Sequence, residues 1–198
     1  MLIFNEKPST LPFNEKRSTQ AAARILRHAG GRLPYMMLIK FMYLADREAL
    51  LRWGTPITGD TYRSMRYGPV LSQTLNLITE EMPDSEAAAS FWRQHIQQQG
   101  YDVLLVNDPQ PDELSAADER VVDEVFAEFY AKYKELHSDR FVFCEYLHSI
   151  LPEYKTAERG QSFPLDHHDI LVAGRKSAEE IKEVESLLDS VGQMQRVR

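Results

Sequence analysis

The chain has 198 residues, 43% of them hydrophobic and 27% charged, with a formal net charge of −7, which fits one folded domain and disfavours general binding to nucleic-acid phosphates. Its single cysteine, Cys144, excludes an internal disulfide framework and fits a reducing compartment. No run of about 18 apolar residues is present, and Glu6 interrupts the apolar start, so we expect a cytoplasmic protein with no membrane segment and no signal peptide.

The N-terminus carries a short duplication. The sequence FNEKPST over residues 4–10 is repeated as FNEKRST over residues 13–19. Prolines in and after the first copy favour extended backbone, which predicts an N-terminal extended arm over residues 1–16. We expect residues 17–198 to form a single domain that ends in a helical pair.

Two helices are predicted next. Ser18 and Thr19 are favourable N-cap residues for a helix over about 20–29, which a pair of glycines ends. A second helix, over about 34–53, is apolar on more than one face. Such a helix is buried by neighbours on several sides, so it is the expected centre of the domain.

A small β element is predicted after the second helix. Glycine and proline break that helix at 54–56, and residues 57–65 are rich in β-favouring side chains. A turn at Gly59 and Asp60 would give a short antiparallel hairpin, which we call the wing. Pro69 is expected to restart a helix.

The second half of the chain is predicted to be mostly helical. Helices are expected over 86–99, 116–136, 139–151, 166–173 and 177–189, and a strand over 101–106. N-cap residues precede four of these helices: Ser115, either Ser138 or Asp139, Asp166 and Ser177. The inward face of the helix over 139–151 is expected to carry Phe141, Cys144, Leu147 and Leu151. The predicted fold is mainly α (α+β), a compact helical domain with a small antiparallel β wing.

Charge is unevenly distributed along the sequence. Residues 17–66 hold nine basic and three acidic side chains, a local charge of +6, so the rest of the chain carries −13. A bipolar molecule of this kind could steer a charged partner to one face. The alternative is that these side chains are solvated helix faces.

The sequence holds no familiar catalytic motif. A glycine-rich phosphate loop, a nucleophile elbow, a zinc-protease helix and a paired cysteine set are all missing. Cys144 and His148 stand four apart on a predicted helix, which could bring a thiol and an imidazole together. Because Cys144 also fits the apolar stripe, we favour a buried cysteine and expect no catalytic residue and no cofactor.

A second constellation, at residues 166–169, reads Asp-His-His-Asp. Adjacent side chains on a helix point about 100° apart, so these four cannot converge on one ion. Asp166 is better explained as a helix N-cap. We expect no metal site here.

Aromatic and basic residues alternate over residues 62–67. Arginine and tyrosine concentrate at protein interfaces, and they also stack on bases and contact phosphates. The alternative is that the rings pack on the preceding helix while the arginines are solvated. The predicted partner-binding residues are Tyr62, Arg63, Arg66, Tyr67 and Pro69.

Three motifs give the chain a family resemblance. Residues 38–46 read LIKFMYLAD, residues 54–60 read GTPITGD and residues 67–70 read YGPV. In this order and spacing they resemble the Panacea domain, or SocA-like antitoxin domain. The similarity extends from about Phe13 to His148, and the closing GRKSAEEI is also similar to the end of longer members.

The resemblance implies an antitoxin of a type II toxin-antitoxin system, which neutralises a cognate protein toxin by direct contact and acts in phage defence. A related role in the family is that of a proteolytic adaptor, which delivers a toxin to an ATP-dependent protease. Neither role needs an active site. A nucleic-acid-binding regulator is the alternative, although nucleic acid is not the expected partner, and a homo-oligomer stays open.

The most recognisable residues make sense first as architecture. Asp46 near a helix end, facing a loop with exposed amides, could tie the second helix to the wing through charge-assisted hydrogen bonds. Glycines and prolines fix the path of the chain on either side. The expected structural residues are Asp46, Gly54, Pro56, Gly59, Asp60 and Gly68.

Overall fold

The computed structural model describes residues 11–79 and 90–196. The helices are α1 (Glu15–His28), α2 (Tyr35–Trp53), α3 (Ser72–Thr79), α5 (Phe91–His95), α6 (Ala116–Glu135), α7 (Arg140–Ile150), α8 (His167–Ala173) and α9 (Ala178–Arg196). The strands are β1 (Arg32–Pro34), β2 (Tyr62–Met65), β3 (Gly68–Leu71), β4 (Ile96–Gln99), β5 (Asp102–Leu105) and β6 (Ser162–Leu165). The mainly helical α+β fold is therefore confirmed.

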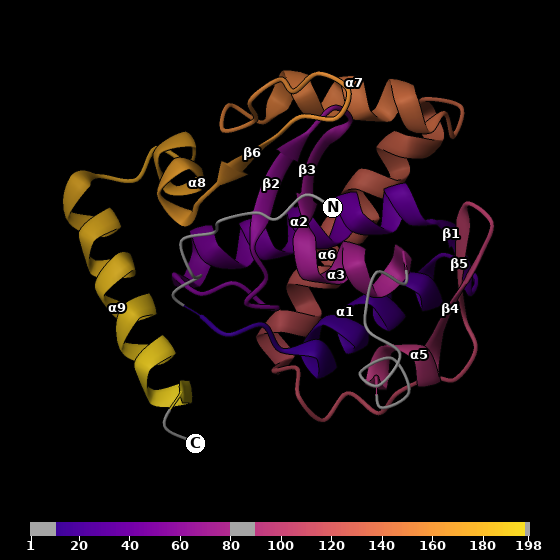
Figure 1. Ribbon diagram of the computed structural model, residues 1–198, viewed down its shortest axis with the longest axis horizontal. Helices are drawn as coiled ribbons and strands as arrows, with labels where there is room; N and C mark the ends of the chain where they lie inside the picture. The colour runs from indigo at the N-terminus through magenta and orange to yellow at the C-terminus, as the bar shows by residue number, and fades with distance from the viewer. Residues whose placement is uncertain (1–10, 80–89, 197–198) are drawn as a thin grey trace.

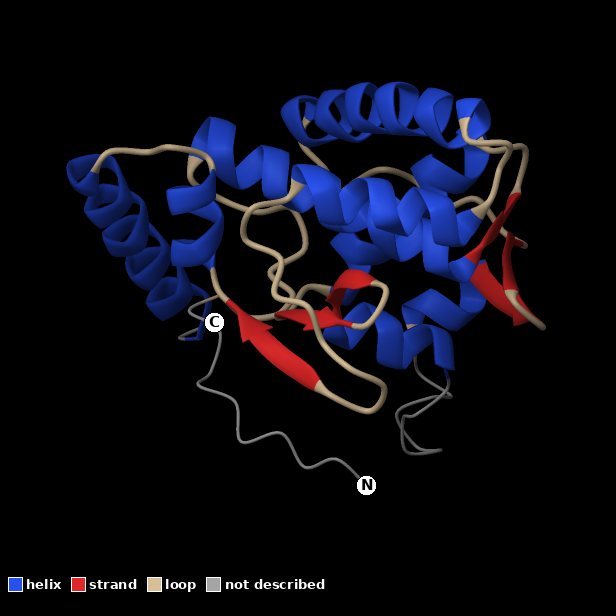
Figure 2. Cartoon of the chain, turned by 90° about the horizontal axis from the view of Figure 1, so that it is seen from above, coloured by secondary structure: helices blue, strands red, loops and turns tan. Residues whose placement is uncertain are grey.

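Two small antiparallel sheets flank the helices (Figure 2). One has the strand order β1-β5-β4 and the other the order β3-β2-β6. Figure 1 shows α8 and α9 at one end of the molecule and β1, β4 and β5 at the other. Within the described chain, none of the helices is long and apolar enough to cross a membrane.

Helix α2 is the centre of the core, as its sequence predicts. Twelve of its 19 residues are buried, because α1, α6, α8 and β3 pack around it (Figure 1). Phe41 packs edge-on against Phe126 and Phe143, with ring centroids 5.5 and 5.7 Å away. Burying a side chain of this size contributes roughly 1.5–3 kcal/mol.

The hairpin predicted over residues 57–65, with its turn at Gly59 and Asp60, is wrong, and the wing extends over residues 62–71. The hairpin consists of β2 and β3, with Tyr62 opposite Leu71, and it turns at Arg66 and Tyr67. Pro69 lies in β3 and does not restart a helix. It is tolerated there because β3 is an edge strand, where a missing N–H leaves no central partner unpaired.

Other boundaries also differ from the predictions. Helix α1 begins at Glu15, where the side chain of Asn14 accepts from the backbone N–H of Arg17, so Ser18 and Thr19 lie inside the helix. The predicted helix over 86–99 is replaced in its second half by β4, and residues 86–89 lie outside the described residues, as do residues 1–10 of the predicted arm. Strands β1 and β6 were not predicted.

The predicted caps of the later helices are confirmed. Ser115 and Asp118 form a capping box at α6. Asp139 caps α7 and Asp166 caps α8. On α7, however, Phe141 is 43% exposed and Phe143 is buried, which corrects the expected inward face.

Candidate partner-binding surface

Asp46 fixes the segment that leads into the wing. Its Oδ1 accepts from the backbone N–H groups of Ile57 and Thr58, at 3.0 and 3.1 Å. Its Oδ2 accepts from the Thr58 hydroxyl at 2.5 Å and from the Tyr62 hydroxyl at 3.1 Å. One buried carboxylate on α2 therefore holds both the loop after the helix and the first strand of the wing.

Asp60 holds the other end of the same segment. Its Oδ1 accepts from the backbone N–H groups of Thr61 and Gln73, at 2.7 and 2.8 Å. Its Oδ2 accepts from the backbone N–H and the hydroxyl of Thr74, at 2.8 and 2.7 Å. Asp60 thereby satisfies the first-turn amides of α3 and brackets the wing between two buried carboxylates.

Burial governs the protonation of both carboxylates. It raises the pKa of Asp46 to about 7, against the hydrogen bonds from Thr58 and Tyr62, which lower it. It raises the pKa of Asp60 to about 6, against the hydrogen bonds from Thr61, Gln73 and Thr74. Desolvation of a charged group thus outweighs donors that favour the ionised form.

A comparison of the wild type with Asp46→Asn at two pH values is expected to reveal the Asp46 titration. The folded-state pKa of about 7 lies above the ordinary value of 3.8, so the folded chain keeps a proton that the unfolded chain has released. This stabilisation is complete below the unfolded pKa and is lost as the pH rises through the folded pKa. We expect the unfolding free energy of the wild type, minus that of Asp46→Asn, to be about 2 kcal/mol larger at pH ~5 than at pH ~7.5.

Urea unfolding at the two pH values measures this difference. The comparison cancels the titrations that Asp46 does not influence, such as those of His148 and His167, whose pKa values burial lowers. The titration of Asp60, which interacts with Asp46 by charge, is measured together with that of Asp46. A difference that does not change with pH would mean that Asp46 is ionised throughout.

Only part of the predicted partner-binding set lies at the surface. Tyr62, Arg63 and Pro69 are buried, whereas Arg66 and Tyr67 are exposed at the turn of the wing. Tyr62 packs between Asp46 and Tyr43, and Arg63 donates to Ser162 on β6. The expectation that Tyr62, Arg63 and Pro69 face a partner is therefore not met, because the third strand and α2 cover them.

Arg66 and Tyr67 belong to a larger surface that we call the aromatic–arginine ladder. It consists of Arg66, Tyr67, Phe141, Arg140 and Tyr101, each in contact with the next. The Arg66 guanidinium lies 5.4 Å from the Tyr67 ring centroid, which lies 5.3 Å from that of Phe141. The Arg140 guanidinium lies 5.0 Å from the Phe141 centroid and 5.1 Å from the Tyr101 centroid.

The ladder joins three elements that are distant in the sequence. The turn of the wing, the start of α7 and the turn between β4 and β5 each contribute to it. Tyr101, Phe141 and Tyr67 are 69%, 43% and 39% exposed, so large apolar rings face solvent in a row. Cation–π contacts hold these rings in place, and rigid exposed aromatic and arginine side chains are typical of binding hot spots.

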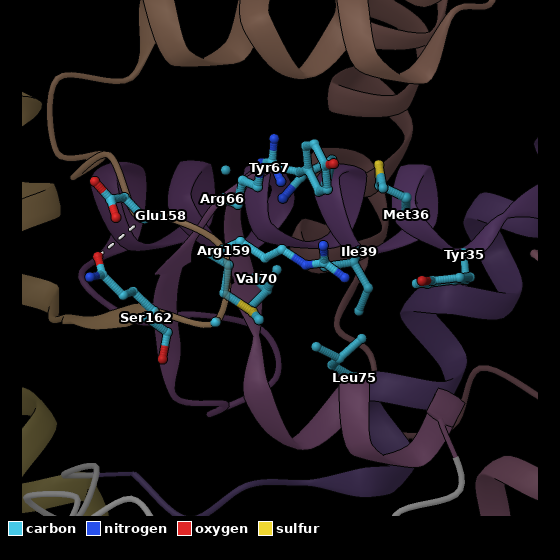
Figure 3. Close-up of a pocket in the computed structure, with 15 residues that line it drawn as sticks. Tyr35, Met36, Ile39, Arg66, Tyr67, Val70, Leu75, Glu158, Arg159 and Ser162 are labelled. Carbon is cyan, nitrogen blue, oxygen red and sulfur yellow. Dashed lines mark hydrogen bonds between the residues drawn. The ribbon is translucent and has the colours of Figure 1, made fainter. Parts of the chain in front are cut away.

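An open pocket of about 530 Å³ lies beside the ladder. Its walls come from the first turns of α2, from the wing, from Leu75 on α3 and from the loop over 158–162. Figure 3 shows Tyr35, Met36, Ile39, Val70 and Leu75 around it, with Arg66 and Tyr67 on one side and Arg159 reaching across toward Ile39. The volume is in the range of pockets that bind a ligand or several side chains.

Lys40 is one of the residues that line the pocket and is 2% exposed. Its ammonium donates to the carbonyl of Pro69 at 2.7 Å, and burial lowers its pKa to about 8. Gly68 makes room for this arrangement, since a Cβ there would lie 3.2 Å from the Lys40 Nζ and 3.3 Å from the His148 Nε2. Lys40 is not among the predicted binding or structural residues, although it lies in the LIKFMYLAD motif on which the family resemblance rests.

The basic half of the sequence does not form a basic surface. Six of its arginines form ion pairs with carboxylates: Arg17, Arg24, Arg27, Arg32, Arg47 and Arg52. Most of those carboxylates come from the acidic remainder of the chain, α6 among them. Folding therefore neutralises the bipolar charge that the sequence suggests, and the phosphate attraction that it could supply is reduced.

The structure does not assemble Cys144 and His148 into a reactive pair. The Cys144 thiol donates to the Met36 sulfur at 3.7 Å, and burial raises its pKa, which disfavours the thiolate. The His148 ring stacks on Tyr154, with centroids 4.1 Å apart. No hydrogen bond joins the two side chains.

The four residues over 166–169 diverge. Asp166 caps α8, His167 packs on Tyr62, His168 pairs with Glu185 and Asp169 pairs with Lys155. Across residues 11–79 and 90–196, no group of three or more His, Cys, Asp or Glu side chains could hold a metal ion.

Comparison of the chain with known families finds a match over a range that contains the residues of the ladder. Residues 38–149 match the model of the family described as antitoxin SocA-like, Panacea domain. The matched range contains most of α2, the wing and most of α7. No curated protein and no solved structure matches the chain.

Proposed function

The chain belongs to the SocA-like Panacea antitoxin domain family, and on that basis we propose that it is the antitoxin of a type II system that neutralises a cognate protein toxin by direct binding in the cytoplasm. The aromatic–arginine ladder is the contact surface in this proposal. Its exposed rings and guanidinium groups supply the side chains that carry most binding energy at protein interfaces. The family match carries the assignment as an antitoxin, and the single observation that carries the contact surface is the ladder, which lies on elements of the matched domain.

Co-expression with the product of the neighbouring gene tests the proposal. We expect growth arrest by that product to be relieved and the two proteins to co-purify. Continued arrest together with the absence of a complex would remove the proposal.

Replacing both Arg66 and Tyr67 by alanine is expected to weaken the complex roughly 100-fold, since each hot-spot side chain contributes about 1–2 kcal/mol or more. Calorimetric titration of the purified partners measures the change. Trp53→Ala is the matched control: Trp53 is 41% exposed and lies at the far end of α2 from the pocket. An equal loss from both variants would contradict a contact at the ladder.

The level of the toxin during co-expression separates two modes of neutralisation. Direct neutralisation leaves the toxin at a normal level in an inactive complex. A proteolytic adaptor would shorten the half-life of the toxin, and that half-life would be restored in cells that lack the protease.

A further inference from the structure

The pocket beside the ladder combines an apolar wall with a positive rim. Tyr35, Met36, Ile39, Val70 and Leu75 contribute apolar surface. Burying an apolar side chain against such a wall stabilises a complex at roughly 25 cal/mol per Å² removed from water. The wall therefore fits apolar side chains of a bound segment.

The charges around the pocket indicate that the bound segment also carries a carboxylate. Its described lining contains three basic residues, Lys40, Arg66 and Arg159, and one acidic residue, Glu158. No ion pair joins Arg66 or Arg159 to a carboxylate of the described chain, whereas six other arginines are paired. In a chain of net charge −7, this rim is a local exception.

The ladder extends the same charge along the surface. Arg140 contacts rings on both sides and no carboxylate of the described chain pairs with it. Buried Lys40 adds positive potential, and among the described residues its ammonium donates only to the Pro69 carbonyl. Arginine forks bind carboxylates bidentately, so an acidic segment along the rim would pair with geometry as well as charge.

We infer that the pocket binds a segment of a partner protein in which an apolar side chain is flanked by carboxylates, the apolar group entering between α2 and the wing and the carboxylates pairing with Arg66 and Arg159. The inference rests on the proposed function, because it assigns the chemistry of the partner at the same surface.

Selection of a random peptide library on the immobilised full-length chain tests this chemistry without the toxin. We expect the enriched peptides to share an apolar residue with Asp or Glu close by in sequence. Binding of a labelled synthetic peptide from the enriched set, followed by fluorescence anisotropy, should weaken as salt rises.

Substitutions at the rim and wall of the pocket test where the peptide binds. Arg66→Glu combined with Arg159→Glu is expected to weaken peptide binding at least about tenfold, because two attractive contacts become repulsive. Arg120→Glu, on exposed α6 surface, is the matched control and should leave binding unchanged. Leu75→Trp fills the pocket and should abolish binding, and the surface arginine variants keep the test valid if that variant does not fold.

Three results would overturn the inference: no enrichment, enriched peptides without acidic residues, or equal effects of the Arg120 and the Arg66–Arg159 reversals. The outcome is separable from that of the proposed function. If the chain binds acidic–apolar peptides but does not bind the toxin, only the proposed function is removed. A chain that relieves the growth arrest and co-purifies with the toxin, but enriches no acidic–apolar peptide, would remove only the inference.

Discussion

Replacing Asp46 by alanine is expected to lower the free energy of unfolding at neutral pH by about 4 kcal/mol, because four donors lose their acceptor in the interior. Two of these donors are the backbone N–H groups of Ile57 and Thr58. Buried polar groups without partners cost about 1–3 kcal/mol each, and water entering the cavity would offset part of that cost. Urea or thermal unfolding measures the loss.

The matched control for this variant is Glu48→Ala on the same helix. Glu48 pairs with Arg52 at 2.6 Å on exposed helix surface. Surface pairs of this kind contribute about 0–1 kcal/mol, so the control should stay close to the wild type. A cost below about 1 kcal/mol for Asp46→Ala would contradict the role of Asp46 as the tie between α2 and the wing.

Gly59→Ala is expected to lower the free energy of unfolding by about 3–4 kcal/mol. Gly59 has a φ of +68°, where alanine costs about 1–2 kcal/mol. A Cβ there would also lie 2.5 Å from the carbonyl oxygen of Pro12, which is backbone and cannot rotate away. Relieving that contact requires a shift of the segment before α1, which is held by the hydrogen bond from the Asn14 N–H to the Thr58 carbonyl.

Gly30→Ala separates the cost of the positive φ from the cost of the Cβ contact with Pro12. Gly30 has a φ of +81°, and a Cβ there would meet nothing within 4 Å. It should therefore lose only the conformational part, about 1 kcal/mol. If thermal unfolding gives equal losses for the two variants, the close approach of Pro12 to Gly59 is not what makes glycine necessary there.

The candidate surface could be predicted only in part. Arg66 and Tyr67 stand out in the sequence because aromatic and basic residues alternate there. Tyr101 and Arg140 carry no such signal, and Phe141 reads as an inward residue of an amphipathic helix. Their part in the ladder arises because the turn between β4 and β5, the start of α7 and the wing lie side by side, which no local pattern encodes.

The wing shows why its register could not be predicted. Residues 57–61 have strand-like composition, yet the amides of Ile57, Thr58 and Thr61 donate to Asp46 and Asp60 and are not available for a hairpin. The hairpin therefore forms one segment later, where β6 from nearly 100 residues away completes the sheet. Strand β6, although distant in the sequence, therefore decides which residues of the wing are covered, and it covers Arg63.

The sequence by itself determined the features that depend on neighbours along the chain. The apolar faces of α2 establish it as the central helix, the caps at Ser115, Asp139 and Asp166 establish where three helices begin, and three motifs indicate the family. The tertiary structure alone decided how charges pair, which wing residues reach solvent, and that a pocket with a positive rim lies beside the ladder. The physical reason is range: capping and helical periodicity act over three or four residues, whereas ion pairs, strand pairing and side-chain stacking join residues that only folding brings together.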